Sequence, residues 1–144
     1  MFKTRLLSGI VLVIAAIFLI VTGNEVLLFS TLLISCIGMF ELFRVFKFEK
    51  SLLSVVPYIG LILFYINLRW SFIPDVMMLF MGFLIVLMFV YVLSYPKYDA
   101  KQLMAAFFGM FYVGAMLSYV YQIRTLNNGL YLAFLVFLCS WGCD

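Results

Sequence analysis

Two carboxylates in this 144-residue sequence lie next to long apolar runs. Acidic side chains are rare in such surroundings and are candidates for a function. Glu41 lies near the end of one such run, and Asp144 follows another. A carboxylate in this setting can hold a divalent cation against phosphate oxygens. Asp144 is therefore the main candidate for a catalytic or metal-binding residue, and Glu41 is a second candidate.

Each carboxylate also has a purely structural interpretation. Glu41 can pair with Arg44 three residues further along a helix, and Asp144 can be a solvated helix terminus. One acid makes no metal site by itself, because protein-bound Mg²⁺ usually takes one or two carboxylates together with substrate oxygens and water. Residue spacing alone leaves these alternatives open.

The three cysteines, Cys36, Cys139 and Cys143, all lie in apolar runs. Their odd number argues against a disulfide framework. The chain contains no histidine that could complete a metal site with Cys139 and Cys143. We therefore expect all three to be buried small hydrophobic residues.

The composition shows which solvent surrounds the chain. Hydrophobic residues make up 68% of it and charged residues 10%, whereas a soluble domain has about 45–50% and about 25%. A soluble fold of about 150 residues buries only about 70% of its surface, so most of this chain must face lipid. A soluble enzyme, a nucleic-acid binder, a disulfide scaffold and a disordered tail are excluded, and the net charge of +3 is too small to indicate a polyanionic partner.

A helix needs about 20 apolar residues to cross a hydrocarbon core of ~30 Å. The sequence predicts an all-α polytopic membrane protein with about six transmembrane helices, forming a single domain over residues 1–144. The first apolar run is too long for a signal peptide, and no small-residue cleavage site follows it. The predicted helices cover residues 6–22, 26–46, 52–66, 76–95, 102–121 and 130–143.

Basic residues predict the orientation, because they are enriched on the cytoplasmic side of membrane proteins. With a cytoplasmic N-terminus, seven lysines and arginines fall on that side and two on the other. Six crossings then bring Asp144 to the cytoplasmic face. The seven are Lys3, Arg5, Arg44, Lys47, Lys50, Lys97 and Lys101, and the two are Arg69 and Arg124.

Other residues predict how the helices bend and pack. Pro57 falls inside the third predicted helix and is expected to kink it. The fifth contains two pairs of small residues spaced four apart, Ala105 with Gly109 and Gly114 with Ser118. Such pairs let helices approach closely in a membrane, so we interpret them as packing positions.

Three short segments carry a resemblance to a known family. The sequence K-T-R-L-L-S-G from Lys3 to Gly9 resembles a basic K-x-R cluster that leads into a first helix, and E-L-F-R from Glu41 to Arg44 resembles the end of a second helix. The sequence W-G-C-D from Trp141 to Asp144 resembles the left edge of a W-x-x-D-[ST]-x-A-[YF] stretch. In layout the whole chain resembles the bacterial phosphatidate cytidylyltransferase (CDP-diacylglycerol synthase) family.

The resemblance implies a nucleotidyltransferase in the cell inner (plasma) membrane. The phosphate of phosphatidic acid would attack the α-phosphorus of CTP, giving CDP-diacylglycerol and pyrophosphate for phospholipid biosynthesis. The protein would position two polyanions and neutralise their charge, mainly through Mg²⁺. Asp144 would position the metal or the nucleotide, Trp141 would be a structural anchor, and Glu41 would be a further site residue.

The resemblance also implies the partners. They are CTP, phosphatidic acid and the lipid bilayer; no nucleic acid is expected, and a homodimer is left open. The family's later signature segments, of the S-P-K-K-T-x-E-G and H-G-G-x-x-D-R-x-D types, do not occur in this sequence. We therefore interpret the chain as an N-terminal portion truncated before the catalytic part, and we expect it to be inactive alone.

Two other interpretations stay open. One is a non-enzymatic multi-pass protein, such as a small transporter or a subunit of a membrane assembly, although a transporter should show polar groups and broken helices near mid-membrane. The other is a CTP-dependent polyprenol kinase. Product analysis with phosphatidate and with polyprenol would separate the two enzymes.

A reporter fused after Tyr98 tests the predicted orientation. Lys97 and Lys101 flank this position, so the positive-inside bias predicts that the reporter is cytoplasmic. A matched fusion after Trp70 should give the opposite readout. A periplasmic signal from the fusion at Tyr98 would contradict the orientation.

Overall fold

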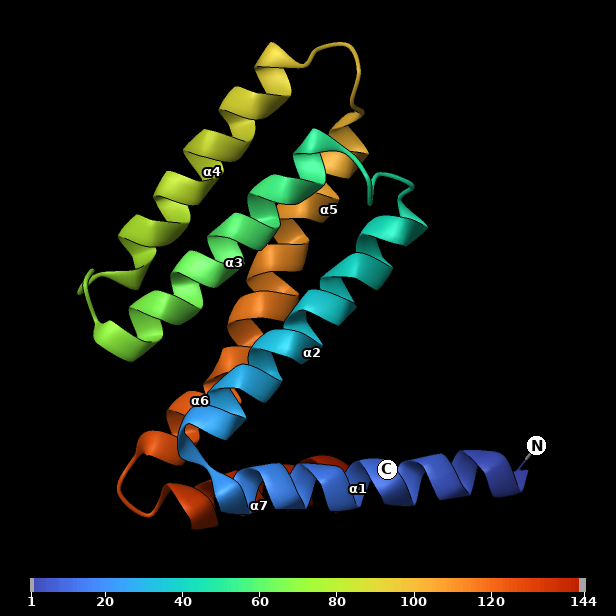
Figure 1. The fold of residues 1–144 in the computed structure, drawn as a ribbon, viewed down its shortest axis with the longest axis vertical. Coiled ribbons are helices and arrows are strands. Elements are labelled where there is room, and N and C mark those ends of the chain that lie inside the picture. Colours follow the sequence, from blue (N-terminus) through green and yellow to red (C-terminus); the bar gives the residue numbers. More distant parts are fainter. Residues whose placement is uncertain (1, 143–144) are drawn as a thin grey trace. The chain divides into compact units, whose positions relative to one another are not determined.

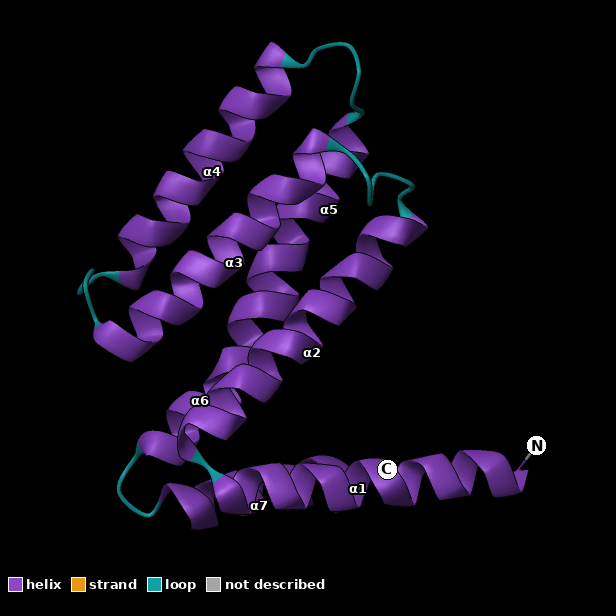
Figure 2. Cartoon of the chain, in the orientation of Figure 1, coloured by secondary structure: helices purple, strands orange, loops and turns teal. Residues whose placement is uncertain are grey.

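The structure is a computed structural model that describes residues 2–142, with side chains described for residues 9, 11, 13–23 and 25–140. Helices joined by short loops account for this part of the chain, which contains no strand (Figure 2). The all-α prediction is confirmed. The elements are α1 (Phe2–Thr22), α2 (Asn24–Val45), α3 (Leu52–Trp70), α4 (Val76–Leu93), α5 (Ala100–Phe108), the π-helix η1 (Gly109–Ala115), α6 (Met116–Thr125) and α7 (Gly129–Gly142).

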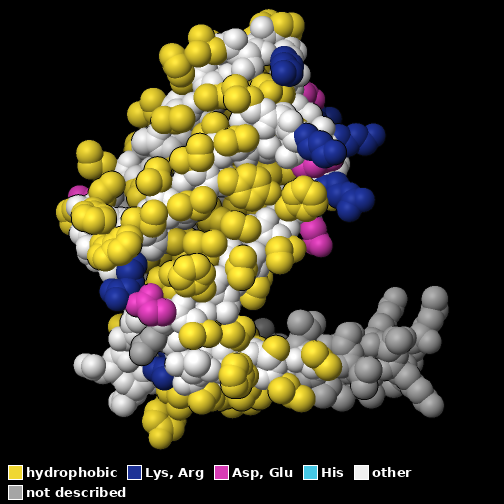
Figure 3. Space-filling view, in the orientation of Figure 1, with side chains coloured by type: hydrophobic (Ala, Val, Ile, Leu, Met, Phe, Trp, Pro, Cys, Tyr) yellow, Lys and Arg dark blue, Asp and Glu magenta, His cyan; other side chains and the backbone are white. Residues whose placement is uncertain are grey.

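Four helical stretches are long and apolar enough to cross a membrane: Glu25–Val45, Leu52–Trp70, Val76–Leu93 and Ala100–Thr125. Two apolar stretches, Val13–Thr22 and Gly129–Ser140, are shorter. Large hydrophobic side chains on all four long stretches are exposed, among them Ile37, Leu63, Phe89 and Met104, and Figure 3 shows such side chains spread over the face it draws. The chain is thus a polytopic membrane protein, while six crossings and a cytoplasmic N-terminus stay predictions.

The third helix extends beyond its predicted end at residue 66, reaching Trp70. The reason is Asn67, a polar residue that we expected to begin a loop. Its buried side chain accepts a hydrogen bond from the Ile73 N–H at 2.7 Å and donates one to the Ile73 carbonyl at 3.1 Å. The side-chain amide of Asn67 therefore holds the loop that follows α3, while the backbone of Asn67 stays helical. The helix also continues through Pro57.

The fifth predicted helix, residues 102–121, is longer and less regular than expected. It begins at Ala100, just after Asp99, whose N–H donates a hydrogen bond to Gln102 Oε1 at 3.2 Å. Its middle widens into the seven-residue π-helix η1, and it ends at Thr125. A π-helix inside an α-helix is rare and often occurs at functional sites, and no periodicity in the sequence indicated it.

The chain divides into two compact units, residues 1–31 with 119–144 and residues 32–118. In the second unit α3 contacts α4, α5 and η1, and α5 and η1 run beside α2 (Figure 1). The interior of this unit is formed by large apolar side chains that are almost completely buried. They include Met39, Phe43, Leu53, Leu61, Leu87 and Met110.

In the first unit α1 contacts α7. Helix α1 ends at Thr22 and is followed by Gly23, whose φ of 62° lies in the left-handed region that favours glycine. Arg124 Nε donates a hydrogen bond to the Ile20 carbonyl at 2.9 Å. The cation thus covers a carbonyl that the helix end leaves without an intrahelical donor, which gives this basic residue a structural role.

The small residues of the fifth predicted helix are packing positions, as expected. Ala105, Gly109, Gly114 and Ser118 are all buried. A Cβ placed on Gly109 would lie 3.0 Å from Phe43 Cε1, and one on Gly114 would lie 2.5 Å from Leu61 Cδ1. The backbone of η1 therefore approaches its neighbours as closely as side chains allow.

Replacing Gly114 with alanine tests this close approach. Leu61 is fully buried, so it has little room to move away, and we expect the free energy of unfolding to fall by ~1–3 kcal/mol through overpacking. Gly82→Ala is the matched control, because a Cβ there meets nothing within 4 Å and alanine favours a helix interior. Thermal unfolding in detergent measures both variants, and equal midpoints would contradict the packing argument.

Candidate functional site

Five basic side chains gather at one end of the second unit, and we call this group the basic end: Arg44, Lys47, Lys50, Lys97 and Lys101. All five are exposed. They come from the last turn of α2, the loop that follows it, and the loop and first turn that lead into α5. In Figure 3 most of the Lys and Arg side chains on the visible face lie at this end, where Figure 1 shows these two loops.

Hydrogen bonds fasten the two loops of the basic end to one another. The backbone N–H of Leu52 donates to the hydroxyl of Tyr98 at 3.1 Å, and Gln102 Nε2 donates to the Phe46 carbonyl at 3.3 Å. The ring of Tyr98 is buried, and Lys97 Nζ lies 5.6 Å from its centre. The basic side chains therefore project from a fixed backbone rather than from independent loops.

This arrangement suits phosphate groups. Lysine and arginine bind phosphate oxygens through charge-assisted hydrogen bonds. The acidic residues near these loops, Glu41, Glu49 and Asp99, leave a positive balance against the five cations. The structure thus brings together the five basic residues of this unit that the sequence analysis assigned to one side of the membrane.

Of the two predicted site carboxylates, the structure describes only Glu41. Glu41 lies on α2 with an exposed side chain, one turn before the exposed Arg44. Asp144 lies outside the described residues, and for Trp141 the structure describes only the helical backbone of α7. Within residues 2–142 no group of three His, Cys, Asp or Glu side chains could hold a metal ion, so this part of the chain does not by itself fit the implied Mg²⁺.

A buried polar cluster that sequence reasoning missed lies beside η1. The hydroxyls of Ser35 and Tyr65 are 3.2 Å apart, and Ser35 Oγ donates a hydrogen bond to the Val113 carbonyl at 3.4 Å. Both side chains are almost completely buried. A serine inside the apolar run of α2 was the available signal, because polar groups at membrane depth need partners.

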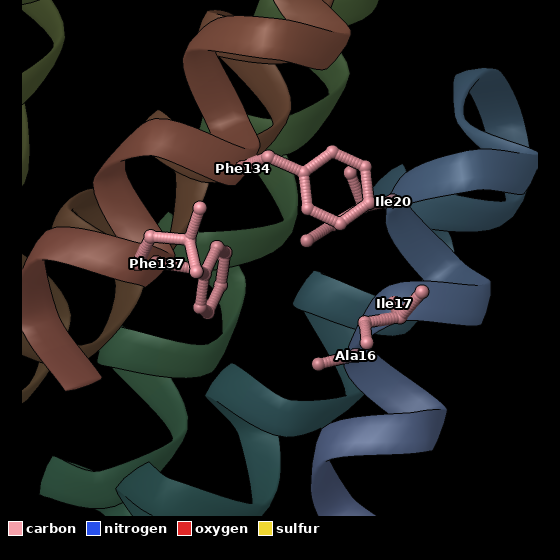
Figure 4. A pocket seen from close by; sticks show the side chains of 6 residues that line it. Ala16, Ile17, Ile20, Phe134 and Phe137 are labelled. Atoms are coloured by element: carbon pink, nitrogen blue, oxygen red, sulfur yellow. The ribbon is translucent and has the colours of Figure 1, made fainter. Parts of the chain in front are cut away.

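The first unit contains a small apolar pocket between α1 and α7. Its volume is about 160 Å³, and Figure 4 shows Ile17 and Ile20 of α1 with Phe134 and Phe137 of α7 around it. Its other lining side chains, Ala16 and Leu138, are apolar too. The pocket therefore offers no group for binding a nucleotide or for catalysis.

Ser35→Ala tests whether the buried cluster supports η1. The change removes a hydrogen bond from the Val113 carbonyl and another from Tyr65, so we expect a loss of ~1 kcal/mol in the free energy of unfolding. Ser30→Ala is the control on the same helix, because Ser30 Oγ bonds only the Val26 carbonyl of its own helix in the described structure. If chemical denaturation in detergent gave the same stability for both variants, the cluster would have no stabilising role.

Comparison with known proteins gives one match. The profile of the cytidylyltransferase family matches residues 3–144. No curated protein and no solved structure matches the chain. The family match covers α2 to α7, nearly all of α1 and also Asp144. It agrees with the apolar helices and with the exposed cluster of basic side chains. The chain is therefore a membrane protein that belongs to the cytidylyltransferase family, a class of nucleotidyltransferases that use CTP.

Proposed function

We propose that the protein transfers a cytidylyl group from CTP to phosphatidic acid in the inner (plasma) membrane. A phosphate oxygen of phosphatidic acid attacks the α-phosphorus of CTP, and the bond from that phosphorus to the β-phosphate oxygen breaks. The products are CDP-diacylglycerol and pyrophosphate. The observation that carries the proposal is the family match over residues 3–144 in a chain whose described part has four helices long and apolar enough to span a membrane.

The acceptor is argued from where the charges lie. A triphosphate needs cations and cannot enter an apolar helix bundle, since burying an unpaired charge is very unfavourable. In the second unit every lysine and arginine except Arg69 lies at the basic end, next to the ends of helices long and apolar enough to span a membrane. An acceptor that is itself a membrane lipid with its phosphate at the surface, such as phosphatidic acid, would reach the same level.

Asp144 is the residue that we propose as a metal or nucleotide ligand, and Glu41 is proposed as a further site residue that does not bind the metal. Mg²⁺ remains part of this proposal through Asp144 alone, because residues 2–142 supply no carboxylate cluster. Substrate oxygens and water would supply the other ligands, as is usual for protein-bound Mg²⁺. The basic end would contribute charge neutralisation.

CTP labelled at different phosphates tests the reaction. The protein translated from its complete coding sequence is incubated in membranes with CTP and either phosphatidic acid or a polyprenol. We expect label from the α-phosphate in the lipid fraction with phosphatidic acid, and no lipid label from the γ-phosphate. Transfer of the γ-label to polyprenol would instead show a polyprenol kinase, and no transfer of either label would favour a non-enzymatic membrane protein.

The same assay tests the two carboxylates. Asp144→Asn should lower turnover by about 100-fold or more, as expected when a charged group at a transition state is lost, and Glu41→Gln should give a smaller loss. Asp75→Asn is the control, because Asp75 is exposed just before α4 and far in sequence from both candidates. Unchanged turnover in Asp144→Asn would remove that residue from the site.

A further inference from the structure

An open groove runs along the second unit between α2 and α5, starting at the basic end. Its volume is about 400 Å³. Five of its six lining residues are apolar, and Lys101 supplies the one charge among them. The lining residues are Leu42, Phe46, Lys101, Met104, Ala105 and Phe108.

The groove is hollow because small residues form its base. Ala105 is buried between the longer side chains of α2 and α5, and one turn further a Cβ on Gly109 would lie 3.1 Å from Leu42 Cδ2. The Phe108 ring, stacked on Tyr112 with centres 4.9 Å apart, forms a wall. At the open end, Gln102 Nε2 holds the Phe46 carbonyl at 3.3 Å, so the two helices keep a fixed spacing.

The groove has a polar end and an apolar end, and the line between them follows the long axis of the membrane-spanning stretches. Lys101 is the second residue of the membrane-spanning stretch Ala100–Thr125, and Phe46 directly follows the stretch Glu25–Val45. From Lys101 to Phe108 the helix rises about 10 Å, which is about a third of the hydrocarbon thickness. The charge therefore lies at the level of lipid headgroups, and the apolar walls lie at the level of acyl chains.

We propose that this groove is a binding site for an anionic phospholipid, with the lipid phosphate at Lys101 and one acyl chain along Leu42, Met104 and Phe108. Basic side chains beside membrane helices select anionic headgroups, and lysine binds phosphate as a point charge. The volume is within the range of small-ligand pockets. The proposal stands on the groove alone and does not depend on which acceptor receives the cytidylyl group.

A second copy of the chain is the competing occupant. An interface between apolar helices would cover the lower part of the groove equally well, but apolar contact by itself does not explain a cation at the end of the groove. A phospholipid matches both the charge at the headgroup level and the apolar walls below it. The lipid is therefore the better fit.

Photocrosslinking in vesicles tests the proposal. The protein is reconstituted in phosphatidylcholine with a trace of phosphatidylglycerol or phosphatidylcholine that carries a photoactivatable group in one acyl chain, and the labelled residues are identified by mass spectrometry. We expect the anionic probe to label the segment from Met104 to Phe108 about fivefold more than the zwitterionic probe, a ratio that corresponds to ~1 kcal/mol for one lysine at a membrane surface. Lys101→Gln should abolish that preference, and Lys101→Arg should retain it.

Lys50→Gln is the matched control, because Lys50 is exposed at the same basic end but does not line the groove. It should keep the preference of the unmodified protein. Equal labelling by the two probes, a preference that survives Lys101→Gln, or no labelling of this segment by either probe would each overturn the proposal.

Discussion

The second unit depends on close contact between the backbone of one helix and the side chains of the next, at positions where the first helix carries glycine. Gly38 on α2, Gly60 on α3 and Gly114 in η1 all lie where an added Cβ would come within 3.0 Å of a neighbouring side chain. In lipid, helices gain nothing from hiding apolar surface, because the solvent is equally apolar, so close van der Waals packing must hold them together. The glycines make that packing possible, and the positions of the loops and of the buried polar cluster follow from it.

The same constraint accounts for the π-helix. A wider turn in η1 brings the Val113 carbonyl to Ser35 at 3.4 Å, so a carbonyl displaced from regular helix geometry still has a donor. No water is available inside a bilayer to serve instead. The irregular backbone and the buried serine are therefore one feature. The serine hydroxyl supplies a donor to the Val113 carbonyl, and that carbonyl supplies an acceptor to the buried hydroxyl.

Composition and the spacing of polar residues were sufficient to predict helices, because every apolar run longer than a few turns must be helical in lipid. Composition and spacing were insufficient to predict features that depend on contacts between a helix and another segment. Asn67 ends no helix because its amide bonds Ile73, and η1 depends on a serine some 78 residues earlier in the chain. Of the site, the clustering of basic residues followed from the positive-inside rule, whereas the groove beside Lys101 required the spacing of α2 and α5.

The distribution of polarity limits where a reaction on CTP can take place. The buried polar side chains of the described residues are Thr31, Ser35, Ser54, Asn67 and Ser118, all of them neutral. A neutral hydroxyl or amide cannot balance the charges of a triphosphate, and an apolar interior makes the imbalance worse. The cations of the second unit that can do so lie at the ends of its helices, where the headgroups of anionic lipids also lie. Nucleotide chemistry in this family member therefore belongs at the membrane surface, where the exposed cations of the second unit lie.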